Sequence, residues 1–262
     1  GLPVDQVSGA GMGVAGYDWP SQRAATLAAI RPLGLRAPLA LVNDALLPLL
    51  AGAVAGWGVA VVAGTSCNCW GWDRARRVGR MTGFAWLGEA AGAKELVDRA
   101  LQAVARQWTR RGPPTALTPA LVARAGARDV ADLLEGLTRE RLQIGPQAAP
   151  LVFQVAAAGD AVAQALIVWA GRELASLALG VIRQLELEPL EFDVVLAGSF
   201  FKGSPLLAKV MREQIHTVTP GARLLRLRVP PVTGGVLLGM AEAGLDPSCA
   251  RATLLASVKE LL

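Results

Sequence analysis

The sequence predicts an α/β protein in which buried strands alternate with helices. The segment Val59–Ala63 is apolar and rich in β-branched residues, as is typical of a strand that is buried on both faces, and Leu39–Val42 has the same character. Helical segments lie between such strands with short connections, which is typical of a layered α/β core. With 262 residues, 53% of them hydrophobic, the chain is long enough for two lobes.

The first part of the chain is predicted to alternate strand and helix. Val7–Val14 is a strand studded with glycine, and Ser21–Ile30 is a helix with Ser21 as its N-cap. The strand at Leu39–Val42 is followed by a short apolar helix, a turn at Gly56–Gly58 and a further strand.

After Gly83 the chain is predicted to be mostly helical before it returns to alternating strands and helices. Gly159-Asp160 is expected to interrupt the longest helical segment, and Gly112-Pro113-Pro114 is the clearest linker. Two helices are expected to close the chain. The other predicted elements are helices at Gly88–Trp108, Pro119–Ala125, Asp129–Leu142, Ala148–Leu187 and Pro205–Ile215, and strands at Phe192–Leu196 and Arg223–Val229.

One uncharged segment, Ala45–Asn68, is long enough to cross a membrane as a helix. Pro48 and the glycines that follow it argue against one continuous helix, so we expect the short helix, turn and strand instead. The first residues, Gly1–Asp5, lack the charged and apolar regions of a signal peptide. We therefore expect a cytoplasmic protein with no membrane partner.

The chain carries a net charge of +5, mostly from arginines scattered in pairs such as Arg76-Arg77. No aromatic residues alternate with them as a base-stacking surface requires, so we expect no nucleic-acid partner. The three cysteines, Cys67, Cys69 and Cys249, form neither a C-x-x-C pair nor a complete set of metal ligands. We expect buried free thiols, a reducing compartment and no protein-bound metal site.

Polar residues follow two predicted strands in a pattern that suits phosphoryl transfer. The strand that begins at Val59 ends in Gly64-Thr65-Ser66, whose amides and hydroxyls suit a phosphate. Asn43-Asp44 follows the strand before it, and Asp44 is a candidate for the base that takes a proton from a substrate hydroxyl. The simpler interpretation makes Asp44 the N-cap of the next helix. The only histidine, His216, follows a helix far along the chain and offers no rival base.

The segment Gly11-Met12-Gly13-Val14-Ala15-Gly16 matches the dinucleotide-binding pattern G-x-G-x-x-G. In that motif the helix starts within the glycines, so that its N-terminus meets the pyrophosphate. Here Tyr17-Asp18-Trp19-Pro20 intervenes. We therefore expect a strand whose glycines allow close packing, and not the dinucleotide-binding site of a nicotinamide enzyme.

Seven short motifs lie along the chain in a fixed order. They are Gly11-Met12-Gly13-Val14-Ala15-Gly16, Val42-Asn43-Asp44-Ala45, Ala63-Gly64-Thr65-Ser66-Cys67-Asn68, Leu87-Gly88-Glu89, Ala157-Ala158-Gly159-Asp160, Val195-Leu196-Ala197-Gly198-Ser199 and Pro230-Pro231-Val232-Thr233-Gly234-Gly235. In this order they resemble the BadF/BadG/BcrA/BcrD ATPase family over nearly the whole chain. Within that family the chain looks most like N-acetylglucosamine kinases, which belong to the actin, hexokinase and Hsp70 superfamily.

The resemblance implies a two-lobed actin-like ATPase (ribonuclease H-like) fold with an incomplete first lobe. Residues 1–55 correspond to the incomplete N-terminal lobe and residues 56–240 to the C-terminal lobe. Residues 241–262 correspond to a C-terminal helix that packs back on the N-terminal lobe. The resemblance leaves open whether the chain forms a homodimer.

The resemblance also implies roles for individual residues. Asp44 corresponds to the base for the sugar hydroxyl, and Asn43, Asn68 and Glu89 correspond to residues of the sugar site. ATP and Mg²⁺ are the implied cofactors, and the implied acceptor is an amino sugar. The implied nucleotide-binding residues are Gly64, Thr65, Ser66, Gly198, Ser199 and Gly203.

The chain departs from the family pattern in two places. Gly88-Glu89-Ala90-Ala91-Gly92 stands where the family has Gly-Asp-Glu-Gly-Ser, so the sugar contact moves outward by one methylene and a neighbouring acid is lost. The family also has a strand-turn-strand with an Asp-Gly-Gly-Gly-Thr type motif for the other side of the ATP phosphates, and this sequence contains no such motif. We therefore expect little or no kinase activity from the chain by itself, and an exposed sheet edge in the first lobe.

Three classes of function stay open at this point. The first is an ATP-dependent amino-sugar kinase. The second is an ATPase of the same family that activates a reductase or dehydratase, which needs cysteines that share an iron–sulfur cluster across a dimer; Cys67 and Cys69 lack that spacing. The third is a non-catalytic sugar-binding remnant, which would bind sugar without nucleotide.

Overall fold

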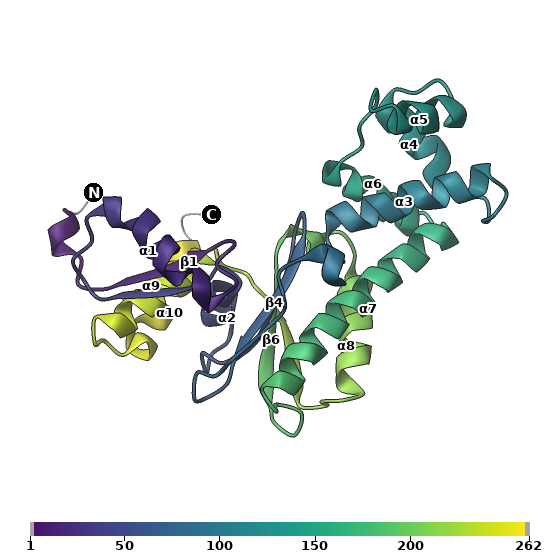
Figure 1. Ribbon diagram of the computed structural model, residues 1–262. Coiled ribbons are helices and arrows are strands. Elements are labelled where there is room, and N and C mark those ends of the chain that lie inside the picture. Colours follow the sequence, from purple (N-terminus) through teal and green to yellow (C-terminus); the bar gives the residue numbers. More distant parts are fainter. Residues whose placement is uncertain (1–2, 260–262) are drawn as a thin grey trace.

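The structure is a computed structural model that describes residues 3–259. Residues 1–2, at the start of the segment in which no signal peptide is predicted, and residues 260–262, at the end of the predicted C-terminal helix, lie outside the described residues. The chain forms two sheets, each with its own helices, and the two sheets lie side by side (Figure 1). We call residues 3–53 together with residues 232–259 the small half, and residues 57–226 the large half.

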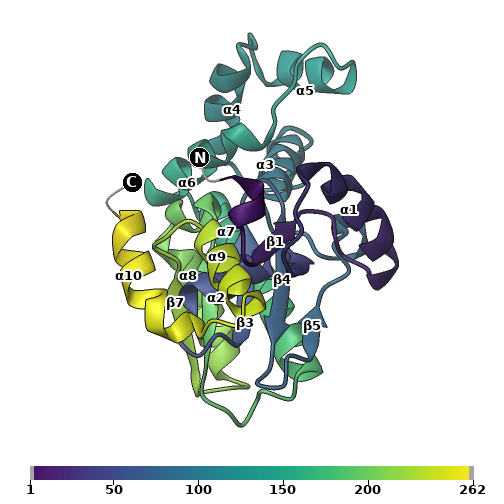
Figure 2. The ribbon, with the colours of Figure 1, turned by 90° about the vertical axis from the view of Figure 1, so that its left-hand side faces the viewer.

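The small half is built on a two-stranded parallel sheet. Its elements are β1 (Ala10–Val14), α1 (Arg23–Ile30), β2 (Leu39–Asn43), α2 (Leu46–Gly52), α9 (Val232–Glu242) and α10 (Pro247–Lys259). β1 pairs with β2 in parallel, so both strands end at the same edge, and in the described residues β1 has no strand partner on its other side. Helix α9 lies against β1, as Figure 2 shows from the side of the small half.

The glycines of β1 allow the close packing that the sequence predicts. A Cβ atom on Gly11 would lie 2.3 Å from the carbonyl oxygen of Gly235 in α9, and one on Gly13 would lie 2.5 Å from Cγ of Leu47 in α2. A turn and a short 3₁₀ helix, not an α-helix, follow β1. The glycine run therefore serves packing between β1 and two helices.

The start of α1 differs from the prediction. Ser21 lies inside the 3₁₀ helix Pro20–Gln22, and α1 begins at Arg23, so Ser21 is not the N-cap. The side chain of Gln22 accepts hydrogen bonds from the amides of Asp18 and Trp19, both at 2.8 Å. Pro20 starts this turn because its fixed φ suits a first helical position, and the turn therefore begins before Ser21.

The large half is built on a five-stranded mixed sheet with the strand order β5-β4-β3-β6-β7. β3 runs parallel to β6 and β6 parallel to β7, whereas β4 and β5 run antiparallel to their neighbours. Its strands are β3 (Gly58–Ala63), β4 (Cys67–Trp72), β5 (Val78–Arg80), β6 (Phe192–Ala197) and β7 (Ala222–Arg226). Its helices are α3 (Ala93–Trp108), α4 (Leu117–Ala125), α5 (Val130–Thr138), α6 (Ala149–Ala157), α7 (Ala161–Gln184) and α8 (Pro205–His216).

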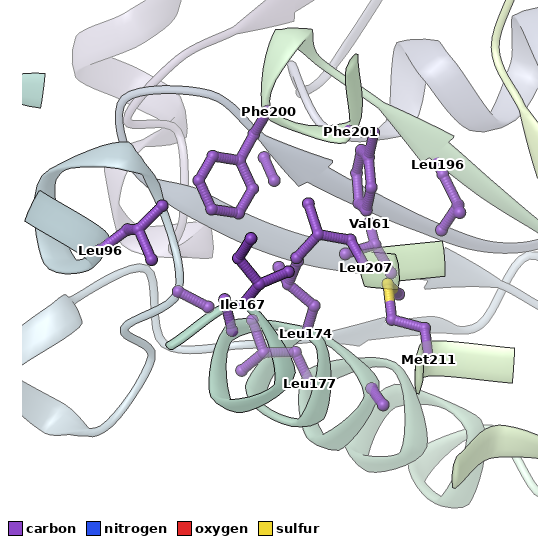
Figure 3. Close-up of a cluster of buried hydrophobic side chains, with 14 of the residues drawn as sticks. Val61, Leu96, Ile167, Leu174, Leu177, Leu196, Phe200, Phe201, Leu207 and Met211 are labelled. Carbon is purple, nitrogen blue, oxygen red and sulfur yellow. The ribbon is translucent and has the colours of Figure 1, made fainter. Parts of the chain in front are cut away.

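Helices α7 and α8 cover one face of the five-stranded sheet and α2 covers the other. Figure 3 shows the core on the α7 side, where Leu174 and Leu177 of α7 and Met211 of α8 meet side chains of the sheet such as Val61. Every residue of α2 from Leu46 to Ala51 is buried, because the helix also contacts α9 and β2. α2 therefore joins the two halves through apolar contacts.

Helix α7 is long and apolar enough, by length and composition, to cross a membrane, and half of its most apolar stretch is buried inside the protein. The helix packs along β3, β4 and β5. The uncharged segment Ala45–Asn68 forms α2, a turn, β3 and the start of β4, which confirms the predicted helix, turn and strand.

The hairpin of β4 and β5 is missing from the sequence prediction. Its residues include two tryptophans and four arginines, which give no clear alternation of apolar and polar positions. The two strands are defined by pairing, β4 with β3 and β5 with β4. α3 begins at Ala93, not at Gly88, because residues 82–92 form a loop. The predicted break at Gly159-Asp160 is confirmed: Asp160 is the N-cap of α7, and its carboxylate accepts from the amide of Ala163.

Candidate active site

Two loops at the ends of the parallel strands β3 and β6 border a cavity of the large half. The carboxyl ends of parallel strands are where open α/β sheets bind ligands. Gly64 and Thr65 follow β3, Ser199 and Gly203 follow β6, and all four line one cavity of about 750 Å³. Gly198 crosses directly over β3, since a Cβ atom there would lie 2.0 Å from the carbonyl oxygen of Ala63. Ser66 is exposed on the same turn.

Helix α3 begins against the Gly64–Ser66 turn. The amides of Ala93 and Lys94 donate to the carbonyl oxygens of Gly64 and Thr65 at 2.9 and 3.0 Å. Gly92 allows this contact, because a Cβ atom there would lie 2.5 Å from Cα of Ser66. The hydroxyls of Thr65 and Ser66 take part in no hydrogen bond within residues 3–259, so they are available to a ligand.

Asn43 and Asp44 follow β2 in the small half, and the structure gives them different environments. Asn43 is 1% exposed and uses its side chain internally: Nδ2 donates to the carbonyl of Tyr17 and to Oδ1 of Asp18, and Oδ1 accepts from the amide of Ala45. Asp44 is exposed and its carboxylate has no side-chain hydrogen bond in the described chain. Partial loss of water around the carboxyl group raises the pKa of Asp44, and repulsion from the negative charge of Asp18 adds a smaller increase.

Glu89 lies in the loop of the large half that meets Asp18. Its carboxylate is buried and accepts hydrogen bonds from the amides of Thr82 and Gly83, the latter at 2.7 Å. Gly83 touches Asp18, since a Cβ atom on Gly83 would lie 2.9 Å from Cγ of Asp18. A chain of contacts from Asn43 through Asp18 and Gly83 to Glu89 therefore connects the predicted sugar residues of the two halves.

Asn68 lies at the start of β4, half-buried, and its Oδ1 accepts from the amide of Cys69 at 2.8 Å, which leaves its Nδ2 for a ligand. The three cysteines are free thiols, as expected, but only Cys69 is buried: Cys67 is half-buried and Cys249 is exposed. Burial raises the pKa of Cys67 to about 11 and holds that of Cys69 well above its usual value, so both stay protonated at neutral pH. Among the described residues no three Cys, His, Asp or Glu side chains cluster as a metal site.

Two charged residues near these sites, Asp18 and Lys202, are not among the residues predicted from the sequence. Asp18 follows β1, the parallel neighbour of β2, and that position was the available signal, because parallel strands bring their ends together. Lys202 lines the cavity between the β3 and β6 loops and supplies a positive charge beside Ser199. The structure thus places four of the six predicted nucleotide residues on one cavity. It connects Asn43 with Glu89 through Asp18 and Gly83, whereas no side-chain hydrogen bond joins Asn68 to either of them within the described residues.

Comparison with curated proteins finds sugar kinases. The chain is 28% identical over 204 residues to the N-acetyl-D-glucosamine kinase of Dictyostelium discoideum, a match that covers 76% of this chain and 64% of that protein. It is 23% identical over 246 residues to the N-acetylmuramic acid/N-acetylglucosamine kinase of Clostridium acetobutylicum, which covers 92% of this chain and 80% of that protein. The chain therefore spans less than two thirds of the Dictyostelium relative. No family model matches the chain.

Two solved structures share the fold. One is a Chromobacterium violaceum protein provisionally assigned as an N-acetylglucosamine kinase, with a TM-score of 0.64, 24% identity, and coverage of 90% of this chain and 78% of that one. The other is a Porphyromonas gingivalis protein with the same provisional assignment, with a TM-score of 0.57, 16% identity, and coverage of 84% and 73%. The mixed α/β architecture described above is thus that of sugar-kinase-like structures.

Proposed function

We propose that this chain carries the catalytic base, Asp44, and one of the two phosphate-binding loops, Gly64–Ser66, of an ATP-dependent amino-sugar kinase. The observation that supports this most is the cavity of about 750 Å³ between the β3 and β6 loops, where four of the six expected nucleotide-binding residues meet. The similarity to kinases of N-acetylglucosamine and N-acetylmuramic acid makes these two sugars the candidate acceptors.

In this proposal ATP binds in the cavity with its phosphates toward the Gly64–Ser66 turn. The free hydroxyls of Thr65 and Ser66 donate to phosphate oxygens, and Lys202 adds positive charge at the rim. Mg²⁺ would enter with the triphosphate, because it usually needs only one or two protein carboxylates besides phosphate oxygens. Neutralising and positioning the phosphates is the main task of such a site.

Asp44 would accept the proton of the sugar hydroxyl while Asn68 holds the ring. The raised pKa of Asp44 makes its carboxylate a stronger base than an ordinary aspartate, which suits a group that accepts a hydroxyl proton. Asn43 acts as a positioning residue, since its amide bonds fix the turn that presents Asp44. Glu89 shapes the sugar side of the site by holding residues 82–83 against Asp18.

We further propose that the small half is an incomplete first lobe. The free edge of β1 and the lack of an Asp-Gly-Gly-Gly-Thr type motif in the sequence support this. Without the loop that carries this motif, the γ-phosphate is bound from one side only, so turnover by the chain alone should be slow. Fusing a strand-turn-strand with that motif ahead of the chain should raise turnover without changing sugar affinity.

The test measures binding and phosphate transfer separately. We expect calorimetry to detect ATP and N-acetylglucosamine binding, and mass spectrometry at high protein concentration to detect slow formation of the sugar phosphate. Asp44→Asn should lower the transfer rate by about 10²- to 10⁴-fold and leave ATP affinity unchanged. Asp98→Asn on α3, whose partner Lys94 is exposed, is the matched control and should change neither.

The pH dependence follows from the raised pKa of Asp44. The transfer rate should rise with pH through that pKa and then level off, because only the ionised carboxylate accepts a proton.

A chain that binds sugar but not nucleotide would instead be a sugar-binding protein without kinase activity. An Asp44→Asn variant with the full transfer rate would remove Asp44 from the role of base.

A further inference from the structure

A second, smaller cavity of about 260 Å³ lies between the two halves, beside the predicted sugar residues. The small half contributes Asp18, Trp19 and Asn43 to its lining, and the large half contributes Trp70, Trp72 and Arg80. A cavity of this size has room for a substituent of a substrate or a few waters, but it is below the usual range for a whole drug-sized ligand.

Three hydrogen-bond donors of this lining lack acceptors within the described residues. Trp70 and Trp72 are only 6% and 9% exposed, and neither indole Nε1 has a partner within residues 3–259. Nη1 of Arg80 and the hydroxyl of Thr82, which lies two residues after Arg80, also have no hydrogen-bond partner within these residues. Buried donors without acceptors are rare because each loses its bond to water without replacement. Three donors around one cavity therefore favour a ligand that brings acceptors.

Arg80 is a fixed cation without a counter-ion. Its backbone exchanges two hydrogen bonds with the side chain of Gln184, at 2.9 and 3.0 Å. Its guanidinium carbon lies 4.2 Å from the ring centroid of Trp19 and 5.7 Å from that of Trp70. Among the described residues Arg80 forms no ion pair, and Asp18, the acid in the same lining, binds Nδ2 of Asn43. The uncompensated charge favours an anionic group.

The cavity is within reach of a sugar in the proposed site. Asn68 and Trp70 lie two residues apart on β4, so their side chains share one face of the strand, roughly 7 Å apart along it. Asn43 lines the cavity and directly precedes Asp44. A short acidic arm on a sugar held by Asp44 and Asn68 would therefore extend toward Arg80.

We propose that this cavity binds the carboxylate of an acidic amino sugar, with Arg80 as the cation and the indole N–H groups of Trp70 and Trp72 as further donors. N-acetylmuramic acid has this chemistry, because it carries a lactyl ether that N-acetylglucosamine lacks. Guanidinium and carboxylate match in planar, two-point geometry, which a lysine does not offer. The identity of the sugar rests on the proposed function, whereas the carboxylate site does not.

The first experiment tests the carboxylate site without any sugar. Lactate is titrated into the protein against lactamide, its neutral analogue, while the indole N–H signals in ¹H–¹⁵N spectra are followed and assigned through Trp70→Phe and Trp72→Phe. We expect saturable shifts of those two signals with lactate only. Arg80→Gln should weaken the effect tenfold or more, and Arg80→Lys should restore it only in part.

The matched control is Arg99→Gln. Arg99 also stacks on a tryptophan, with its guanidinium carbon 3.8 Å from the ring of Trp169, but it lies on α3 away from this cavity. This variant should bind lactate as the unaltered chain does. Equal shifts with lactamide or inorganic phosphate, no shift with lactate, or an Arg80→Gln variant that still binds lactate would overturn the carboxylate site.

The second experiment compares the two sugars by calorimetry in the absence of ATP. We expect Arg80→Gln to weaken N-acetylmuramic acid binding tenfold or more while N-acetylglucosamine binding stays within twofold. If N-acetylglucosamine binds and the Arg80 variant treats both sugars as the unaltered chain does, the inference fails and the proposed function stands. If lactate binds through Arg80 but neither sugar binds, the carboxylate site stands and the amino-sugar assignment of both proposals fails.

Discussion

Glu89 offers the sharpest test of how the loop over the site is held. The resemblance makes it a sugar ligand, but in the structure both carboxylate oxygens accept backbone amides, from Thr82 and Gly83. Hydrogen bonds to a charged group contribute about 1.5–3 kcal/mol each. Glu89→Gln keeps one acceptor and turns an amide NH₂ toward the other N–H, so we expect the free energy of unfolding to fall by about 1.5–3 kcal/mol.

For a chain of this size that loss corresponds to a decrease of about 3–12 °C in the melting temperature. Urea unfolding measures the free energy, and hydrogen exchange should show loss of protection at the amides of Thr82 and Gly83. Glu135→Gln is the control, since its side chain is 57% exposed in a surface pair with Arg139 and should change stability by less than 0.5 kcal/mol. Unchanged stability together with lost sugar binding would refute the loop-holding role and return Glu89 to the sugar.

Two further predictions concern charged groups that hold helices in place. The carboxylate of Asp132 accepts from Arg128 and Arg141, and these bonds hold its pKa well below the usual range. The ionised carboxylate should thus stabilise the protein fully at neutral pH, and this contribution should be lost as the pH falls through its lowered pKa. Asp132→Asn should therefore destabilise the protein at pH 7 but not in strong acid. Circular dichroism followed during an acid titration of both proteins measures this. Arg251 of α10 donates to the carbonyl oxygen of Leu50 at 2.6 Å. Arg251→Met should lower the free energy of unfolding in urea by about 1.5–3 kcal/mol. An unchanged urea midpoint would mean that α10 is held by apolar contacts alone.

The sequence predicts the strands that lie in the centre of the sheets. β3 is apolar, β6 is apolar apart from Asp193, and a glycine follows each strand, so this pattern depends mainly on burial and on the turn that follows. The β4–β5 hairpin was missed because its residues meet different surroundings on each face. Trp70 and Trp72 pack toward α2, while Gly71 and Gly79 are required where Val181 and Leu185 of α7 come close. Such requirements come from tertiary contacts and leave no periodicity.

The candidate site shows the same limit. Gly64 and Thr65 could be chosen from the sequence because they follow a predicted strand, whereas Ser199 was implied only by the family resemblance. The structure places all three on one cavity. The fixed side chains of Asn43 and Glu89 could not be anticipated, because their partners lie in Tyr17-Asp18 and Thr82-Gly83, and only the folded loops bring these residues into contact. The type of each residue predicts the chemistry of its side chain. Which side chains remain free to bind a ligand depends on the contacts that the folded loops make.

The most direct test of the central claim is nucleotide binding by Gly64→Val. A Cβ atom on Gly64 would meet no atom within 4 Å, and Gly64 lines the proposed nucleotide cavity, so the added side chain should extend into that cavity without disturbing the fold. We predict that calorimetry with ATP will show at least tenfold weaker binding for this variant, at an unchanged melting temperature and unchanged N-acetylglucosamine affinity. ATP binding equal to that of the unaltered chain would contradict the account, because the phosphates would then lie elsewhere.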